Sequence, residues 1–205
     1  MPARPLIPES LPLGAHVDAD HLWWQVLNRA QGAGRRAAVF LDRDGVVVEE
    51  VDYLHRPEDV RLIDGAAEVI AEANRRALPV VLVTNQAGVG RGHYGWTEFA
   101  AVQERIVDEL AGLGAMVNGV FACPHHAEGR PPYDRPRHAW RKPNPGMLLA
   151  AAERLPVDLA KSWIVGDRAI DLEAGRNAGL AGDGFRVLAG QTIADARRLL
   201  PLFMG

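Results

Sequence analysis

Three short apolar runs that end abruptly in polar residues most constrain the fold of this chain. The runs lie at residues 37–41, 79–83 and 163–165, and the polar turns that follow them at 42–45, 84–86 and 166–168. Between and after them, apolar residues recur at helical spacing over about 65–77, 97–111, 146–155 and 169–179. Alternating strands and helices predict an α/β fold, a Rossmann-like doubly wound sheet of parallel strands. The carboxyl ends of such strands border the binding crevice, so the polar turns should meet there.

The first 36 residues precede this pattern and are predicted to form an extension docked on a body of residues 37–205. Residues 1–17 are rich in proline, whereas the next segment predicts a helix over about 18–31 with Asp18 as its N-cap. Trp23 and Trp24 would anchor that helix on the body, although an exposed tryptophan would favour a dimer interface. The apolar stretch 116–122, a short strand over 185–188 and a helix over 192–200 complete the predicted elements.

Composition excludes several classes of protein. The 23 Lys and Arg residues nearly balance the 26 Asp and Glu residues and are dispersed, which argues against a polybasic nucleic-acid binder. Cys123 is the single cysteine, so an internal disulfide is impossible. No apolar run approaches the roughly 20 residues of a membrane span, and the N-terminal segment lacks the apolar centre of a secretory signal. We expect a cytoplasmic protein that acts as a monomer or homodimer, without nucleic-acid or membrane partners.

The carboxylates at the strand ends suggest a metal site. Asp42 and Asp44 alone could be ordinary turn residues, because aspartate satisfies backbone amides in turns. Asp167 would bring a third carboxylate from another strand end, and three converging carboxylates repel one another unless a cation is present. Mg²⁺ takes oxygen ligands of this kind. The pattern therefore favours a Mg²⁺ site.

A carboxylate beside a cation can also attack phosphorus and form an aspartyl-phosphate. Such a reaction needs donors and a fixed cation for the phosphoryl oxygens, and Thr84 and Lys142 are candidates. It also needs a proton for the leaving oxygen, which Asp44 could supply to a reaction at Asp42.

The motifs that contain these residues resemble those of the haloacid dehalogenase (HAD) superfamily of phosphatases. The resemblance rests on Val39 to Val46, Val83 to Gln86, Arg141 to Pro143 and Val165 to Arg168 in that order. Within the superfamily, the segments 84–92, 123–126 and 141–147 are similar to the heptose bisphosphate phosphatases and the related histidinol-phosphate phosphatases.

The resemblance implies a role for each matching residue. Asp42 would be the nucleophile, Asp44 the general acid and then the base, and Thr84 and Lys142 would hold the phosphoryl group. Mg²⁺ would be bound by Asp42, Asp167 and the main-chain carbonyl of Asp44. Asp171 is expected to support the site or cap a helix rather than bind the metal. The residues expected to bind substrate are Arg43, Glu50, Tyr53, Asn85, Gln86 and Arg141.

The spacing of the motifs leaves no room for a separate cap domain. Short elements already fill the segments from Asp44 to Thr84 and from Thr84 to Lys142. The chain therefore resembles the capless members, in which the loops 46–60 and 123–141 shape the pocket. An open pocket suits a small phosphorylated metabolite.

The 123–141 loop departs from the pattern of those relatives. They carry a Zn²⁺ ion held by Cys-x-His and Cys-x-Cys, whereas here His138 and Trp140 replace the second pair. Cys123, His125 and His138 could form a mixed zinc site, with His126 or Asp134 as the fourth ligand. The alternative is a metal-free loop held by its prolines and by packing of Trp140.

Together these features predict a Mg²⁺-dependent phosphomonoesterase that acts on a small sugar phosphate. D-glycero-D-manno-heptose 1,7-bisphosphate is the first substrate that the resemblance suggests, and histidinol phosphate is the alternative. A protein that only binds a phosphorylated metabolite is a rival of another class, but it would be expected to have lost at least one catalytic group. A mutase is a further rival, which the missing cap disfavours.

Overall fold

The computed structural model describes residues 10–28, 34–182, 184–188 and 190–195. Their seven strands form one sheet in the order β1-β2-β5-β4-β3-β6-β7. Five of them are parallel: β3 (Val39–Leu41), β4 (Val80–Asn85), β5 (Gly119–Cys123), β6 (Trp163–Gly166) and β7 (Phe185–Arg186). This parallel part confirms the predicted doubly wound α/β fold.

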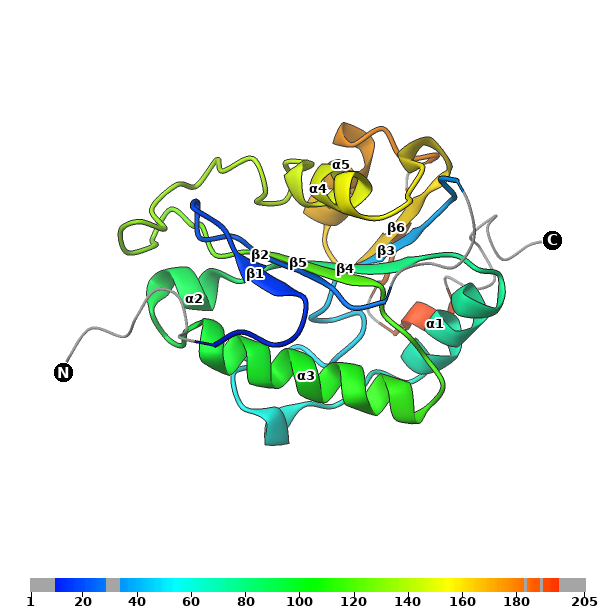
Figure 1. Ribbon diagram of the computed structural model, residues 1–205, viewed down its shortest axis with the longest axis horizontal. Helices are drawn as coiled ribbons and strands as arrows, with labels where there is room; N and C mark the ends of the chain where they lie inside the picture. The colour runs from blue at the N-terminus through cyan, green and yellow to red at the C-terminus, as the bar shows by residue number, and fades with distance from the viewer. Residues whose placement is uncertain (1–9, 29–33, 183, 189, 196–205) are drawn as a thin grey trace.

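Helices cover both faces of the sheet (Figure 1). One face carries α1 (Ala66–Arg75), α2 (Ala87–Arg91) and α3 (Trp96–Gly112), and the other carries α4 (Gly146–Arg154) and α5 (Ala169–Asn177). Two 3₁₀ turns, η1 (Pro57–Asp59) and η2 (Leu159–Lys161), lie in the connections. The helices predicted over 65–77, 97–111, 146–155 and 169–179 are thus confirmed within a few residues.

The sheet is buried on both faces, which explains its uninterrupted apolar runs. In β4, Val80 and Leu82 pack into the core beneath α1 and α3, while Val81 and Val83 pack into the core beneath α4 and α5. No helix in the described ranges is long and apolar enough to cross a membrane.

The predicted helix over 18–31 is wrong. The extension instead forms a hairpin of β1 (Ala15–Val17) and β2 (Trp23–Val26), and β2 pairs antiparallel with β5. Residues 1–9 and 29–33 of the predicted extension lie outside the described residues, as do residues 196–205, where most of the helix predicted over 192–200 would fall.

Burial shows why the strand prevails. Trp23 is fully buried against Trp96 and Phe99, whereas Trp24 turns to the opposite face, where it stacks on His16. This alternation has the period of two that a strand requires. Adjacent tryptophans can therefore anchor both faces of the sheet, and the edge of β5 gains a partner for its backbone groups.

Candidate active site

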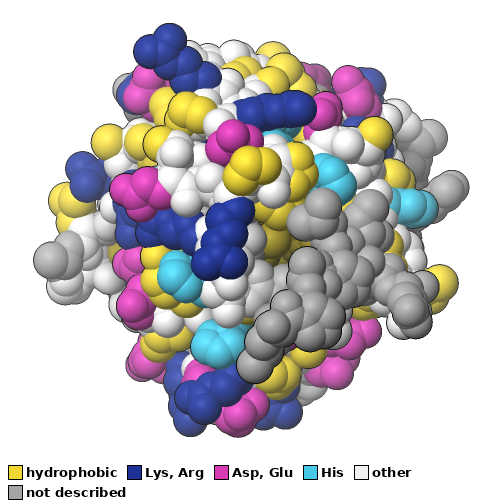
Figure 2. Space-filling model, turned by 90° about the vertical axis from the view of Figure 1, so that its left-hand side faces the viewer, with side chains coloured by type: hydrophobic (Ala, Val, Ile, Leu, Met, Phe, Trp, Pro, Cys, Tyr) yellow, Lys and Arg dark blue, Asp and Glu magenta, His cyan; other side chains and the backbone are white. Residues whose placement is uncertain are grey.

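The carboxyl ends of the parallel strands border a cavity of about 580 Å³. Figure 2 looks onto this end of the molecule, where β4 gives way to α2, and shows Lys, Arg and His side chains gathered with acidic ones. Every residue expected to act as a catalyst, Mg²⁺ ligand or substrate contact lies on the wall of this cavity: Asp42, Arg43, Asp44, Glu50, Tyr53, Thr84, Asn85, Gln86, Arg141, Lys142 and Asp167. The loops 46–60 and 123–141 both contribute to its wall, as expected for a fold without a cap.

A buried ion cluster lies at the bottom of the cavity. The ammonium group of Lys142 lies 2.8 Å from the Asp42 carboxylate and 2.6 Å from the Asp171 carboxylate, and it donates a hydrogen bond to the carbonyl oxygen of Val83 at 2.9 Å. Asp42 is fixed from the other side because its second oxygen accepts the backbone N–H of Arg43 at 2.7 Å. The lysine thus joins motifs that lie far apart in the sequence.

Burial and charge shift the titration of this cluster. Burial raises the pKa of Asp42 to about 7; Lys142 opposes the rise, and Asp171 and Asp44 add to it. Burial acts to lower the pKa of Lys142, but the carboxylates of Asp42 and Asp171 outweigh it, and the net shift is upward. Lys142 therefore stays protonated at neutral pH, and Asp42 is stabilised as a carboxylate by any additional cation beside it.

The carboxylates of Asp42, Asp167 and Asp171 form a candidate metal site. One oxygen of each lies within 4.8 Å of the others, and no other His, Cys, Asp or Glu side chains in the described ranges form such a group. The Asp171 carboxylate already pairs with Lys142 and accepts a hydrogen bond from the backbone N–H of Arg168. Through this second contact Asp171 caps α5, as expected. Asp42 and the half-buried Asp167, whose pKa burial also raises, are thus left to bind a cation.

Gly45 allows Asp167 to approach the end of β3. Its φ of +76° lies in the left-handed region, and a Cβ at this position would lie 2.7 Å from Oδ2 of Asp167. A side chain here would push the carboxylate away. An oxygen-only donor set close to the backbone of residues 42–45 fits Mg²⁺, which usually keeps several waters.

Asp44 is held away from Asp42 by its own contacts. Its carboxylate accepts hydrogen bonds from two nitrogens of the Arg43 guanidinium, at distances of 2.9 to 3.2 Å. It also accepts a hydrogen bond from Nε2 of Gln86 at 3.0 Å. Thr84 lies at 3.4 Å and also accepts from Gln86 at 2.8 Å. Arg43 and Gln86, which we expected to bind substrate, thus orient the predicted acid and the phosphoryl-binding threonine.

Asn85 has a comparable positioning contact. Its side-chain amide donates to the carbonyl oxygen of Lys142 at 3.1 Å and accepts the backbone N–H of Lys142 at 3.0 Å. These paired bonds join the end of β4 to the segment that carries the lysine. Asn85 lines the cavity as predicted, but in this structure its amide positions Lys142.

A second group of side chains, which we call the outer wall, lies further from the ion cluster: Tyr53, Arg91, His126 and Arg141. Arg91 hydrogen-bonds the hydroxyl of Tyr53, lies 3.3 Å from Nε2 of His126 and pairs with the exposed Glu128 at 2.8 Å. Burial lowers the pKa of Arg141, and the charges of Arg91 and Arg168 lower it further. These cations repel one another, which makes the outer wall attractive to an anion.

Arg91 and His126 were absent from the residues predicted from sequence to act in catalysis or to bind substrate. Both stand in quoted motifs, the segments 84–92 and 123–126, so a signal was present. What the sequence did not reveal is that the short helix α2 turns Arg91 back across the cavity mouth toward the 123–141 loop.

The predicted zinc ligands do not assemble. Nε2 of His125 faces the carbonyl oxygen of Asp20 at 3.0 Å, and Nδ1 of His138 accepts the backbone N–H of Trp140 at 3.2 Å. The two imidazoles stack 4.2 Å apart at 8°, so their ring edges do not converge on one point. Burial raises the pKa of the Cys123 thiol to about 12, which disfavours the thiolate that zinc needs. The residues present do not fit zinc.

Comparison with known proteins places this geometry in a family. A HAD-hydrolase-like family model matches residues 139–199. A D-glycero-beta-D-manno-heptose-1,7-bisphosphate 7-phosphatase of Mesorhizobium japonicum is 48% identical over 144 residues, which are 70% of this chain and 66% of that relative. A protein of the same name from Rhodopseudomonas palustris is 40% identical over 75% of this chain and 85% of its own length.

A solved structure agrees with these relatives. The D,D-heptose 1,7-bisphosphate phosphatase of B. bronchiseptica, complexed with magnesium and phosphate, has a TM-score of 0.67 and 32% identity. The match covers 80% of this chain and 98% of that protein.

Proposed function

The chain belongs to the family of HAD-like phosphatases that includes the heptose-1,7-bisphosphate 7-phosphatases, and from this premise we propose that it is a Mg²⁺-dependent sugar-bisphosphate phosphatase. The observation that carries the proposal is the buried Asp42 carboxylate, held by Lys142 beside Asp167 at the bottom of a cavity with a cationic outer wall. A heptose 1,7-bisphosphate is the proposed substrate.

The reaction begins with attack of an Asp42 carboxylate oxygen on the phosphorus atom. The bond between phosphorus and the ester oxygen breaks, and Asp44 gives its proton to the leaving oxygen. Asp44, now a carboxylate, then takes a proton from water. The water oxygen attacks the aspartyl-phosphate, which releases inorganic phosphate and restores Asp42.

Other side chains hold the groups that react. Thr84 donates to a phosphoryl oxygen, and Lys142 keeps a positive charge beside Asp42 throughout. Asp42, Asp167 and the carbonyl oxygen of Asp44 would bind Mg²⁺, which when bound neutralises charge on the phosphoryl oxygens. Gln86 keeps Asp44 and Thr84 on the same side of the cavity.

The outer wall selects the substrate. A sugar bisphosphate carries a second phosphate that does not react, and Arg91 and Arg141 offer guanidinium groups that match phosphate geometry. Glu50 and Arg168, paired at 2.6 Å at the rim, would meet the sugar hydroxyls. We therefore propose that discrimination among phosphate esters arises at the outer wall and not at the ion cluster.

The test is Mg²⁺-dependent phosphate release from both anomers of heptose 1,7-bisphosphate, other sugar phosphates and bisphosphates, histidinol phosphate and nucleotides. Asp42→Asn protein is the blank. A preference for a heptose bisphosphate supports the proposal, and a preference for histidinol phosphate would replace the substrate but keep the chemistry. Bound Mg²⁺ without any phosphate release would favour a binding protein. Transfer to sugar acceptors would indicate a mutase.

A cytoplasmic location and a monomeric or dimeric state remain predictions. The division into an extension of residues 1–36 and a body of residues 37–205 also remains a proposal, although β2 is now a strand of the common sheet.

A further inference from the structure

We propose that the turn of the N-terminal hairpin, residues 18–22, positions Arg141 for substrate recognition and acts through His125. This inference rests on the proposed function for its substrate. It assigns a role to a segment that the catalytic motifs do not include.

The hairpin turn has a defined shape. The Asp18 carboxylate accepts the backbone N–H groups of Asp20 at 2.9 Å and Leu22 at 3.0 Å. Between them, His21 takes a φ of 59°, in the left-handed region that is unfavourable for a residue with a side chain. Leu22 is buried in the core beneath α4 and α5. Asp18 and Leu22 thus fix the direction of the Asp20 carbonyl group.

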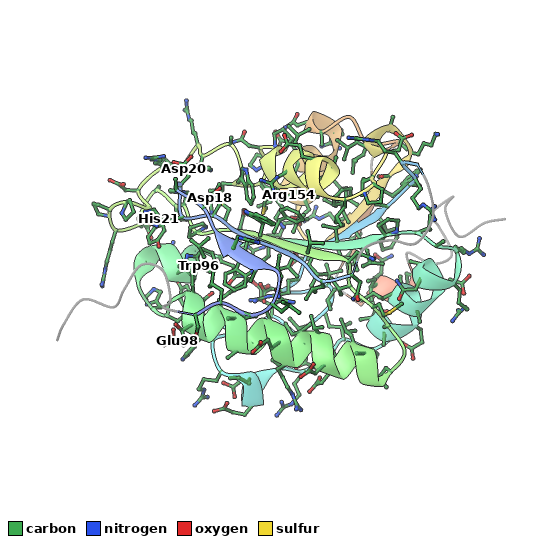
Figure 3. All side chains as sticks on the ribbon, in the orientation of Figure 1. Asp18, Asp20, His21, Trp96, Glu98 and Arg154 are labelled. Atoms are coloured by element: carbon green, nitrogen blue, oxygen red, sulfur yellow. The ribbon has the colours of Figure 1, made fainter. Side chains whose placement is uncertain are left out.

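The turn meets the 123–141 loop at two points. The Asp20 carbonyl oxygen faces Nε2 of His125 at 3.0 Å, and since a carbonyl only accepts, the imidazole must donate. The Asp20 carboxylate pairs with Arg135 at 2.9 Å. Figure 3 shows Asp18, Asp20 and His21 at the tip of the hairpin, beside this loop. Of the two contacts, the first is partly buried and the second is exposed, so the first should contribute more.

His125 passes this restraint to the cavity. Its side chain is 1% exposed and is packed between the hairpin turn, the ring of His138 and the edge of Tyr133. Its carbonyl oxygen accepts a hydrogen bond from the Arg141 guanidinium at 2.8 Å. One residue therefore bonds the turn through its side chain and the outer wall through its backbone.

The consequence is specific to Arg141. A long arginine side chain loses much rotamer freedom when it binds an anion, and a fixed carbonyl acceptor reduces that loss in advance. Loosening His125 should weaken substrate binding while leaving Asp42 and Lys142 untouched, because their contacts come from β3, β4 and α5. Hence KM should change and kcat should not.

The test compares full-length Mg²⁺-loaded variants on heptose 1,7-bisphosphate and on p-nitrophenyl phosphate, which has no second phosphate. His125→Leu removes the imidazole donor from a buried position, and His125→Gln restores a donor. Arg154→Met is the matched control, because the Arg154 guanidinium lies 4.7 Å from the ring centroid of Trp24 and so contacts strand β2 of the same hairpin. Figure 3 shows Arg154 apart from Asp18, Asp20 and His21 at the tip of the hairpin.

We expect His125→Leu to raise KM for the bisphosphate about tenfold, with kcat within about twofold. KM for p-nitrophenyl phosphate should not change, His125→Gln should recover most of the loss, and Arg154→Met should behave as the parent. In an Arg141→Met background, His125→Leu should add little, because coupled residues are not additive.

Equal losses on both substrates, or full additivity with Arg141→Met, would overturn the inference. If His125→Leu fails to fold, Asp18→Ala replaces it and should show the same selectivity, since it loosens the turn from its exposed side. If the parent protein does not hydrolyse the bisphosphate, the proposed function fails instead. The comparison of His125→Leu, Arg141→Met and the double variant then uses another readout, the inhibition of p-nitrophenyl phosphate hydrolysis by fructose 1,6-bisphosphate. This inhibition still reports on anion binding by Arg141.

Discussion

The ion cluster and the outer wall face the same cavity but are built in opposite ways. Asp42, Lys142 and Asp171 come from the end of β3, the loop before α4 and the first turn of α5; they are almost completely buried and satisfy one another's charges. Arg91 and Arg141 come from a short helix and a loop, repel each other and are held by a tyrosine hydroxyl, an exposed glutamate and a carbonyl oxygen. The contrast supports the proposal that the buried cluster carries the reaction, whereas the residues of the outer wall select the substrate.

Asp42→Asn should give the largest effect. An amide cannot attack phosphorus, so turnover should fall at least about a thousandfold on every phosphate ester. Phosphate release measured beside circular dichroism separates lost chemistry from lost folding. Activity near that of the parent would show that Asp42 is not the nucleophile. The proposed division of labour between the ion cluster and the outer wall would then fail as well.

Lys142→Met should have the second-largest effect, a decrease in the free energy of unfolding. It leaves two buried carboxylates without their cation, and breaking a buried ion pair costs about 3–5 kcal/mol. Urea unfolding, with Mg²⁺ removed, measures the change in the free energy of unfolding. The matched variant is Arg168→Met, which breaks an exposed pair with Glu50 and should cost below about 1 kcal/mol. Equal costs would show that the cluster is not the more tightly coupled region.

Mg²⁺ binding should depend on pH through the cluster. With a pKa of about 7, Asp42 is mostly protonated at pH 6 and mostly ionised at pH 8, and only the ionised form binds a cation well. Titration calorimetry should therefore show affinity about tenfold weaker at pH 6 than at pH 8. The dependence should largely disappear in Asp42→Asn protein, and a flat profile in the parent would contradict the assignment of Asp42 as a ligand.

Arg91→Met should have the smallest effect and should sharpen the comparison. We expect KM for the sugar bisphosphate to rise about fivefold with kcat nearly unchanged, because a binding contact is lost and no reacting group. Arg105→Met, on the exposed side of α3 where Arg105 pairs with Glu109, is the control. A fall in kcat with unchanged KM would place Arg91 in the reaction instead of in recognition.

Part of the site was predictable from sequence because Asp42, Thr84 and Asp167 lie at or directly after strand ends. An apolar run followed by Asp42 or Thr84 is a local pattern, and the parallel topology brings such patterns to one edge. The contact between Lys142 and Asp171 is also consistent with the expectation that Asp171 supports the site. What the pattern did not show is that the amides of Asn85 and Gln86 hold Lys142, Asp44 and Thr84, since an amide in a turn has many possible partners.

The extension was mispredicted because its capping residue and its apolar spacing are compatible with both a helix and a hairpin. Asp18 does cap backbone N–H groups, but it caps those of a tight turn and not those of a helix. The spacing of Leu22, Trp23 and Val26 suits a helix, yet an open edge of β5 gave these residues a strand partner. Such a choice is made by tertiary contacts that no window of sequence contains. Sequence left open whether the 123–141 loop binds zinc for a related reason, since Asp20, whose carbonyl oxygen faces Nε2 of His125, lies about a hundred positions from it.

The pairing of β2 with β5 also has a consequence for the order of assembly. Trp23 finds its register opposite Ala122, so β2 cannot pair with β5 until about a hundred further residues have been synthesised. Until then the hairpin is an isolated two-stranded element, which is marginally stable in water. We expect the central strands to associate first and the hairpin to join a sheet that is already formed. The hairpin of β1 and β2 is thus made before its partner strand β5 and joins the sheet after it, and the mouth of the cavity takes its final form only with that late step.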